Sequence, residues 1–307
     1  MNFHIISEKL SEDSKKTLRE SVEQFSNYKI NFYDLTGEIF DNLYTSYALT
    51  KAIYYRLCIA EMLSKNITKC LYLDSDMLCV DSIYDLYDTD IKNYAAAAVI
   101  DPLDTHRAKN LGYDPNLGYF NSGMLLLNLD YWRNNNCAAE IIKFLADNSD
   151  KFYDQDGINY ILRGKILSIS PEYNMFASIL CQTALPGKDY FDAYSKTVKN
   201  PCVIHYTSNR KPWFIEYDDA ANNLWCFVKS KTIYKDMALL SVYNRSFDSK
   251  IKTFFYKLKI LRNRNKGYLW FKKLRNKIRD RLQKREPREY ATLDAKCDFE
   301  ALRRRFD

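Results

Sequence analysis

The feature that most constrains this chain is a short apolar segment that runs directly into two aspartates. Residues 69–73 read Lys-Cys-Leu-Tyr-Leu and are followed by Asp74-Ser75-Asp76. Because alternate side chains of an extended chain point the same way, Asp74 and Asp76 are expected to project together beyond a strand end. In open α/β sheets, ligands bind outside the carboxyl ends of the strands, so this position predicts a ligand site.

Two carboxylates this close repel each other unless a cation lies between them. Oxygen donors suit Mg²⁺ or Mn²⁺, the ions that hold diphosphates. Taken alone, Asp-x-Asp is equally typical of a solvated turn after a strand, and both interpretations remain open at this point.

Expected strands and helices alternate along the rest of the chain. Apolar runs predict strands at 3–6, 29–34, 69–73, 95–100, 120–129, 166–169 and 202–205, and helices at about 11–25, 47–63, 129–148 and 153–162. This alternation indicates an α/β fold with a mostly parallel central sheet. With 307 residues, the chain is long enough to bury a full α/β core and to carry an appendage.

The eight cysteines have no Cys-x-x-Cys spacing, and several fall in expected strands or helices, where a free thiol behaves as a small apolar group. This usage indicates a reducing compartment and no structural zinc. We find no signal peptide and no apolar run long enough to span a bilayer. Together these features predict a cytoplasmic protein.

Two further segments carry a family resemblance. They are Tyr119-Phe-Asn-Ser-Gly-Met-Leu-Leu-Leu-Asn-Leu-Asp-Tyr-Trp-Arg133 and His205-Tyr-Thr-Ser-Asn-Arg-Lys-Pro-Trp213. With Leu71-Tyr-Leu-Asp-Ser-Asp76 ahead of them, the chain resembles glycosyltransferase family 8 over roughly residues 2–213. It looks most like the bacterial galactosyl- and glucosyltransferases that extend lipopolysaccharide or lipo-oligosaccharide. The resemblance implies a GT-A (Rossmann-like) nucleotide-sugar fold and a UDP-hexose donor.

The resemblance also implies a metal site. It makes His205 the third protein ligand, beside Asp74 and Asp76, of a Mn²⁺ (or Mg²⁺) ion that holds the donor diphosphate. Lys211, within His-x-x-x-x-x-Lys-Pro-Trp, would add a positive charge to the same diphosphate. Without the motif, a single His after Val-Ile is more typical of a core position, and Lys211 of an ordinary surface lysine.

The remaining candidate residues are carried over from the family in the same way. The residues implied to bind the donor, besides Asp74 and Lys211, are Arg56, Ser75, Asn121 and Ser122. Asp154 would hold sugar hydroxyls, and the Gln155 amide would lie near the anomeric carbon, on the face opposite the leaving group. The alternatives are a surface salt bridge for Arg56, a strand-entry turn for Asn121 and Ser122, and a helix cap for Asp154.

The family retains the α configuration of the donor. A double displacement would need a carboxylate nucleophile, and Gln155 is a poor nucleophile. We therefore expect a same-face reaction through a short-lived ion pair.

Two departures from the family stand out. Family members begin with an additional strand and helix, and Phe3–Ile6 resembles their second strand, so the first βα unit is expected to be missing. Truncation, a misassigned start or an inactive copy would each explain this. Ser208 also stands where the family usually has glycine.

The C-terminal part is strongly basic. Residues 250–288 contain 16 Lys or Arg against Asp280 and Glu286, a net charge of +14, so a whole-chain charge of +7 leaves −7 for the remainder. Apolar residues recur there at helical spacing. We predict a transferase domain over 1–245 and, over 246–307, a basic amphipathic helical tail that attaches to an anionic membrane surface. Nucleic-acid binding and a plain solvated helix are the less favoured alternatives.

These observations predict a retaining hexosyltransferase that moves galactose or glucose from a UDP-sugar to a lipid-linked lipopolysaccharide or lipo-oligosaccharide acceptor. It would be peripheral at the inner face of the cytoplasmic membrane. The alternative is a catalytically inactive relative that acts as a membrane-associated scaffold.

Overall fold

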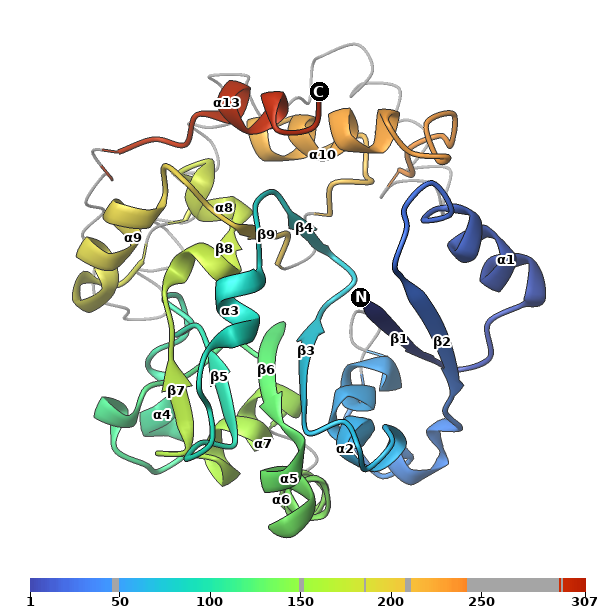
Figure 1. Ribbon diagram of the computed structural model, residues 1–307. Helices are drawn as coiled ribbons and strands as arrows, with labels where there is room; N and C mark the ends of the chain where they lie inside the picture. Colours follow the sequence, from blue (N-terminus) through green and yellow to red (C-terminus); the bar gives the residue numbers. More distant parts are fainter. Residues whose placement is uncertain (46–49, 149–151, 185, 208–210, 242–292, 294) are drawn as a thin grey trace, which may run out of the picture. The chain divides into compact units, whose positions relative to one another are not determined.

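The computed structural model describes residues 1–45, 50–148, 152–184, 186–207, 211–241, 293 and 295–307 (Figure 1). The chain divides into two compact units, which we describe separately. Unit 1 comprises Met1–Met175, Pro186–Thr197 and Pro201–His205, and unit 2 comprises Phe176–Leu185, Val198–Asn200 and Tyr206–Asp307.

Unit 1 alternates strands with helices in its described residues, as the sequence predicts. Its strands are β1 (Asn2–Ser7), β2 (Lys29–Asp34), β3 (Lys69–Leu73), β4 (Met77–Cys79), β5 (Ala96–Ala98), β6 (Met124–Asn128), β7 (Ile166–Ser168) and β9 (Val203–His205), and β8 (Met175–Phe176) lies at the unit boundary. Its α-helices are α1 (Glu12–Glu20), α2 (Ile59–Met62), α3 (Tyr84–Asp88), α4 (Arg107–Asn110), α5 (Leu129–Asn134), α6 (Cys137–Asp147), α7 (Asp154–Ile161) and α9 (Phe191–Thr197). Short 3-10 helices are η1 (Gly37–Phe40), η2 (Lys51–Cys58), η3 (Pro115–Leu117), η4 (Pro171–Asn174) and η5 (Lys188–Tyr190).

The central sheet has the strand order β3-β6-β5-β7. β6 is antiparallel to both β3 and β5, whereas β5 and β7 are parallel. Strands β3, β5 and β7 therefore run in one direction, and β6 alone runs against them. The α/β prediction is confirmed. The sheet is mixed rather than mostly parallel, because β6 begins at the end of the sheet where β5 finishes and therefore runs antiparallel to it.

Helices and loops cover both faces of this sheet, which explains the unbroken apolar sequence of β6. Leu125 and Leu127 pack on one face in a cluster with Trp132 and Ile141. Met124 and Leu126 point to the other face, where Met124 packs with Leu86 and Val99, and Leu126 with Ile91 and Ala97. A strand buried on both faces reads as a continuous hydrophobic run rather than as an alternating one.

Strands β1 and β2 form a separate parallel pair, connected by α1. Ser11 caps α1, as expected, by accepting a hydrogen bond from the Ser14 N–H at 3.1 Å. In the described part of the chain, β1 pairs only with β2, and β3 only with β6. The expectation that the family's first βα unit is missing stays a prediction.

The helix predicted at about 47–63 is a 3-10 helix, η2, followed by the single α-helical turn α2. Residues 46–49 lie outside the described part. Within η2, Arg56 Nε donates to the Ile53 carbonyl at 3.0 Å. The Arg133 side chain donates hydrogen bonds to the carbonyls of Ala60 at 2.8 Å and Leu63 at 3.1 Å. These carbonyls at the end of α2 therefore have hydrogen-bond donors.

Unit 2 contains α8 (Ala177–Leu180), α10 (Ala220–Ser230) and α13 (Phe299–Arg304). Helix α13 packs against α10, and its Leu302 side chain is buried. The predicted tail boundary at residue 246 and the basic run 250–288 lie outside the described residues and stay predictions. None of the helices in the described ranges combines the length and the apolar character that crossing a membrane requires.

Candidate functional site

Three strands of unit 1 bring their ends to the candidate site. Asp74 directly follows β3, and its N–H donates to the carbonyl of Gly123, just before β6, at 2.8 Å. His205 ends β9, where it pairs with Met77 of β4 across an antiparallel ladder. The register of two separate sheets therefore fixes the positions of these side chains.

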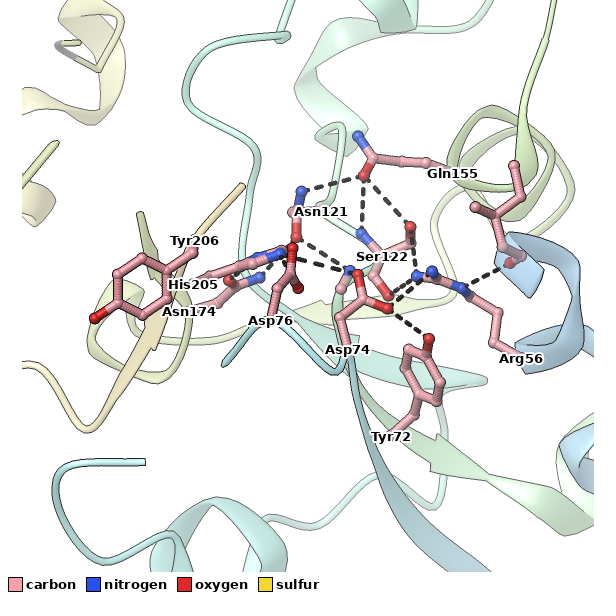
Figure 2. Close-up of polar contacts among 12 residues, drawn as sticks. Arg56, Tyr72, Asp74, Asp76, Asn121, Ser122, Gln155, Asn174, His205 and Tyr206 are labelled. Carbon is pink, nitrogen blue, oxygen red and sulfur yellow. Dashed lines mark hydrogen bonds and ion pairs between the residues drawn. The ribbon is translucent and has the colours of Figure 1, made fainter. Parts of the chain in front are cut away.

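Asp74, Asp76 and His205 form a cluster whose ligand atoms all lie within 4.8 Å of one another (Figure 2). His205 Nε2 is 3.3 Å from Asp76 Oδ1 and 3.9 Å from Asp74 Oδ2. Two carboxylate oxygens suit Mg²⁺ or Mn²⁺, and an imidazole nitrogen favours Mn²⁺ of the two. This donor set fits a divalent cation and leaves further coordination positions for a ligand.

Glycine at position 123 keeps this cluster open. A Cβ atom on Gly123 would lie 2.3 Å from His205 Cε1 and 2.9 Å from Asp74 Oδ2. Real Cβ atoms do not approach other atoms so closely, so any other residue here would displace two of the three candidate ligands.

Among the described residues, Tyr72 and Arg56 both hold the Asp74 carboxylate through the same oxygen. Oδ1 accepts hydrogen bonds from the Tyr72 hydroxyl at 2.5 Å and from Arg56 Nη2 at 2.9 Å, while Oδ2 faces His205. Burial raises the pKa of Tyr72 well above its usual value, so the phenol stays a donor. The neighbours thus orient Asp74 and leave its second oxygen for the cluster.

Arg56 is buried, with 6% of its surface exposed, and is therefore not part of a surface salt bridge. Its Nη1 donates to the Ser122 carbonyl at 2.6 Å and to Ser122 Oγ at 3.1 Å. Its Nε lies 3.2 Å from Asp154 Oδ2. One guanidinium therefore connects Asp74, which follows β3, with Ser122 before β6 and with the start of α7.

Asp154 is buried at the start of α7, where Ser122 Oγ donates to its Oδ2 at 3.3 Å. Burial raises the pKa of Asp154, although the charge of Arg56 opposes the shift. Asp156 takes part in capping α7, because its carboxylate accepts a hydrogen bond from the Tyr153 N–H at 3.1 Å. The Asp154 carboxylate therefore faces Arg56 and Ser122, and its contact with a sugar stays a prediction.

Gln155 lies between the Asn121–Ser122 pair and the carboxylate of Asp101. Its Oε1 accepts from the Ser122 N–H at 3.0 Å and from Asn121 Nδ2 at 3.2 Å. Its Nε2 donates to Asp101 Oδ2 at 3.2 Å. Burial, followed by the charge of Asp104, raises the pKa of Asp101.

Asn121 and Asn174 connect this end of the site with His205. Asn121 Nδ2 also donates to Asp101 Oδ2 at 3.2 Å, and its Oδ1 accepts from the Gly123 N–H at 3.1 Å and from Asn174 Nδ2 at 2.9 Å. Asn174 Oδ1 lies 2.9 Å from His205 Nδ1. A continuous hydrogen-bond network therefore runs from Asp101 and Gln155 to His205. Figure 2 shows the part of it from Gln155 to His205.

Sequence reasoning missed three members of this network. Tyr72 precedes Asp74 by two positions and so shares its face of the strand, a signal that could have identified it. Asp101 follows the predicted strand at 95–100, as Asp74 follows β3. Asn174 lies in Pro-Glu-Tyr-Asn, which contains no motif that would single it out.

The last three residues singled out in the sequence are Ser75, Lys211 and Ser208. Ser75 is exposed between the two aspartates. Lys211 belongs to unit 2, where its Nζ donates to the Tyr206 carbonyl at 2.9 Å, and its contact with a diphosphate stays a prediction. Ser208 lies outside the described residues.

Comparison with known proteins identifies the family. The profile described as Glycosyl transferase family 8 matches residues 1–216. The chain belongs to this family. This match confirms the family resemblance that was predicted from the segments at Asp74, Asn121 and His205.

Known relatives are moderately similar to this chain in sequence. General stress protein A of Bacillus subtilis is 29% identical over 222 residues, which cover 69% of this chain and 76% of that protein. Lipopolysaccharide 1,2-glucosyltransferase of Escherichia coli K12 is 28% identical over 218 residues, which cover 69% of this chain and 64% of that protein. The second alignment thus spans less than two thirds of the relative.

Solved structures of glycosyltransferases share the fold. Galactosyltransferase LgtC, in complex with donor and acceptor sugar analogs, matches with a TM-score of 0.66 at 24% identity, over 76% of this chain and 85% of LgtC. The bifunctional glycosyltransferase WbbM matches with a TM-score of 0.60 at 20% identity, over 72% of this chain and 43% of WbbM. These likenesses confirm the GT-A-like α/β fold of this family 8 chain.

Proposed function

We propose that this family 8 protein is a metal-dependent, retaining hexosyltransferase that moves galactose or glucose from a UDP-sugar to a lipid-linked lipopolysaccharide or lipo-oligosaccharide acceptor. The observation that carries the proposal is the Asp74–Asp76–His205 cluster, with ligand atoms within 4.8 Å, connected through Arg56 to the buried Asp154. The names of the relatives supply the class of acceptor.

Asp74 Oδ2, Asp76 and His205 would hold the cation. When bound, a divalent ion acts as a Lewis acid on the departing diphosphate, which is worth several kcal/mol. Arg56 keeps Asp74 oriented through Oδ1, and Ser75 and Lys211 are the proposed further contacts of the donor.

Asp154 and Gln155 would face the transferred sugar. Asp154 has a carboxylate oriented by Arg56 and Ser122, which suits hydrogen bonds to sugar hydroxyls. The Gln155 amide, fixed by Asn121, Ser122 and Asp101, offers an oxygen dipole but no strong nucleophile. We therefore propose that the acceptor hydroxyl attacks on the face from which the diphosphate leaves.

The site assignment is tested with Asp76→Ala. Removing one of two carboxylate ligands should abolish both hexose transfer from UDP-galactose or UDP-glucose and the Mn²⁺-dependent hydrolysis of these donors. Asp147→Ala, at an exposed position at the end of α6, is the matched control and should retain activity. Unchanged metal-dependent hydrolysis in Asp76→Ala would remove the assignment.

The stereochemical course has its own test. Mass spectrometry of the protein quenched during turnover should reveal no sugar attached to Asp154. A trapped glycosyl-Asp154 adduct would show a double displacement and would contradict the same-face mechanism.

The basic run 250–288 supports the proposal of a peripheral protein at the inner face of the cytoplasmic membrane, where lipid-linked acceptors are available. The inactive-scaffold alternative predicts a different outcome. A protein that binds Mn²⁺ and anionic vesicles but transfers no hexose from any UDP-sugar tested would favour it.

A further inference from the structure

Asn174 is completely buried in unit 1 at the end of η4, and the proposed reaction gives it no role. Its amide lies between His205 Nδ1 and Asn121 Oδ1, at 2.9 Å from each. The carbonyl and amino ends of an amide are distinguished by their partners, so the neighbours must decide which end faces which residue.

The neighbours of Asn121 fix the orientation of its side-chain amide. Its Oδ1 lies 3.1 Å from the backbone N of Gly123, and a backbone N–H can only donate. Its other end lies 3.2 Å from Asp101 Oδ2, a carboxylate oxygen that accepts. Both contacts require Oδ1 to face Gly123 and Nδ2 to face Asp101.

The orientation of Asn174 then follows. Because Asn121 presents an oxygen, Asn174 must donate to it through Nδ2 and must turn Oδ1 toward His205. An amide oxygen can only accept, so His205 Nδ1 must carry a proton. The Gly123 N–H therefore fixes the orientation of the Asn121 amide, and Asn121 fixes that of Asn174. Asn174 in turn fixes the proton on His205 Nδ1.

The consequence lies at the other ring nitrogen. In a neutral imidazole only one nitrogen carries a proton, so a proton on Nδ1 leaves the lone pair on Nε2. Nε2 is the atom that faces Asp76 Oδ1 at 3.3 Å and Asp74 Oδ2 at 3.9 Å. Without Asn174, the two carboxylates would favour the proton on Nε2, where it would block a metal ion.

We infer that Asn174 is a positioning residue that fixes His205 in the tautomer able to bind a metal through Nε2. The inference rests on the proposed metal site. Helix η4 is held independently of this side chain, because the Glu172 carbonyl accepts from the Cys202 N–H at 2.9 Å. Variants at Asn174 should therefore keep the local fold.

The tautomer can be observed directly in the wild-type protein. The chain has three histidines, so ¹⁵N-histidine NMR gives few signals, and a His205→Ala sample assigns the relevant one. In metal-free protein, Nδ1 of His205 should carry a proton. An unprotonated Nδ1 would overturn the inference without any variant.

Variants test the role of Asn174. Asn174→Leu, close in shape but without hydrogen bonds, should move the proton to Nε2 and weaken Mn²⁺ binding about 10- to 100-fold, measured by calorimetry without substrate. Asn174→Asp still accepts from Nδ1 and should keep the proton there, although its second oxygen cannot replace the donation to Asn121 Oδ1. Asn222→Leu, which removes a buried amide from unit 2, should change neither the tautomer nor the affinity.

The outcomes separate this inference from the proposed function. If His205→Ala leaves Mn²⁺ affinity unchanged, the metal-site proposal fails. If His205→Ala loses affinity while Asn174→Leu retains both affinity and tautomer, only the role of Asn174 is refuted.

Discussion

At the scale of single residues, the candidate site is defined by which atom of each side chain is already occupied. Asp74 uses Oδ1 for Tyr72 and Arg56, and His205 uses Nδ1 for Asn174. The second polar atoms, Asp74 Oδ2 and His205 Nε2, face each other, and Nε2 also faces Asp76. This arrangement preorganises the ligands, because their rotamers are fixed before any ion binds.

Gly123→Ala tests whether the space between Asp74 and His205 must stay clear of additional atoms. The new Cβ would meet His205 Cε1 at 2.3 Å and Asp74 Oδ2 at 2.9 Å. We expect at least about a tenfold loss of Mn²⁺ affinity and a loss of about 1–3 kcal/mol in unfolding free energy, measured by calorimetry and urea denaturation.

The matched control is Gly187→Ala. There the nearest atom to a new Cβ is the Pro102 carbonyl oxygen at 3.7 Å, an ordinary contact. Wild-type Mn²⁺ affinity in Gly123→Ala would show that the ion does not lie between Asp74 and His205.

Asp101→Asn tests the electrostatic state of the network. Burial raises the pKa of Asp101, so the folded protein binds this proton more tightly than the unfolded chain does. The contribution of Asp101 to the unfolding free energy should therefore fall as pH rises from about 3.9, the unfolded value, through the raised folded value.

The measurement is the difference in unfolding free energy between wild type and Asp101→Asn, from urea titrations at several pH values between about 4 and 7. Asparagine does not titrate, and the other ionisable groups are common to both proteins. A difference that grew in favour of the wild type with rising pH would contradict the predicted direction.

At the scale of elements, the site depends on connections that hold short segments in place. Helix α2 has four residues, too few to be stable alone. Arg133 of α5 supplies donors to the carbonyls of Ala60, Leu63 and Ile67, which lead from α2 into β3. The strand that carries Asp74 is thus anchored at its start by one guanidinium.

We expect Arg133→Met to destabilise the protein by about 2–4 kcal/mol, because several partly buried carbonyls lose their donors. Urea denaturation gives the value. Arg163→Met is the control, because Arg163 is exposed, and its change should stay within about 0.5 kcal/mol. Equal effects of the two substitutions would refute the anchoring role of Arg133.

At the scale of the whole molecule, charge is unevenly distributed along the sequence. The run 250–288 has a net charge of +14 and the remainder −7. Each basic residue near an anionic leaflet contributes about 1 kcal/mol, so a few engaged together suffice for reversible attachment. Helix α13, which follows this run, packs against α10 in unit 2, so a test should leave residues 293–307 in place.

Replacing the 16 Lys and Arg of 250–288 by Gln should abolish flotation with anionic vesicles while the melting temperature is retained. Replacing only the lysines of this run by Arg keeps the charge and should preserve binding. Wild-type binding should weaken with added salt. Binding to duplex RNA with no vesicle association would instead favour the nucleic-acid alternative.

Sequence patterns predicted much of this protein because their information is local. Period-two and unbroken apolar runs identified β1, β2, β3, β6 and β9, and the order of three motifs identified the family. Asp74, Asp76 and His205 were grouped by these motifs, and the structure brings them together. Each of these inferences needed only residues close in sequence, or a spacing shared with known proteins.

Only the tertiary structure decided the direction of β6, the pairing of β4 with β9 and the polar network behind the ligands. Asn174 reaches His205 and Asn121 from 31 and 53 residues away, and Asp101 meets Gln155 from 54. Hydrogen-bond direction depends on which donors and acceptors are brought within about 3 Å. Packing of distant segments sets those distances, so the sequence named the ligands and the fold determined which of their atoms face one another.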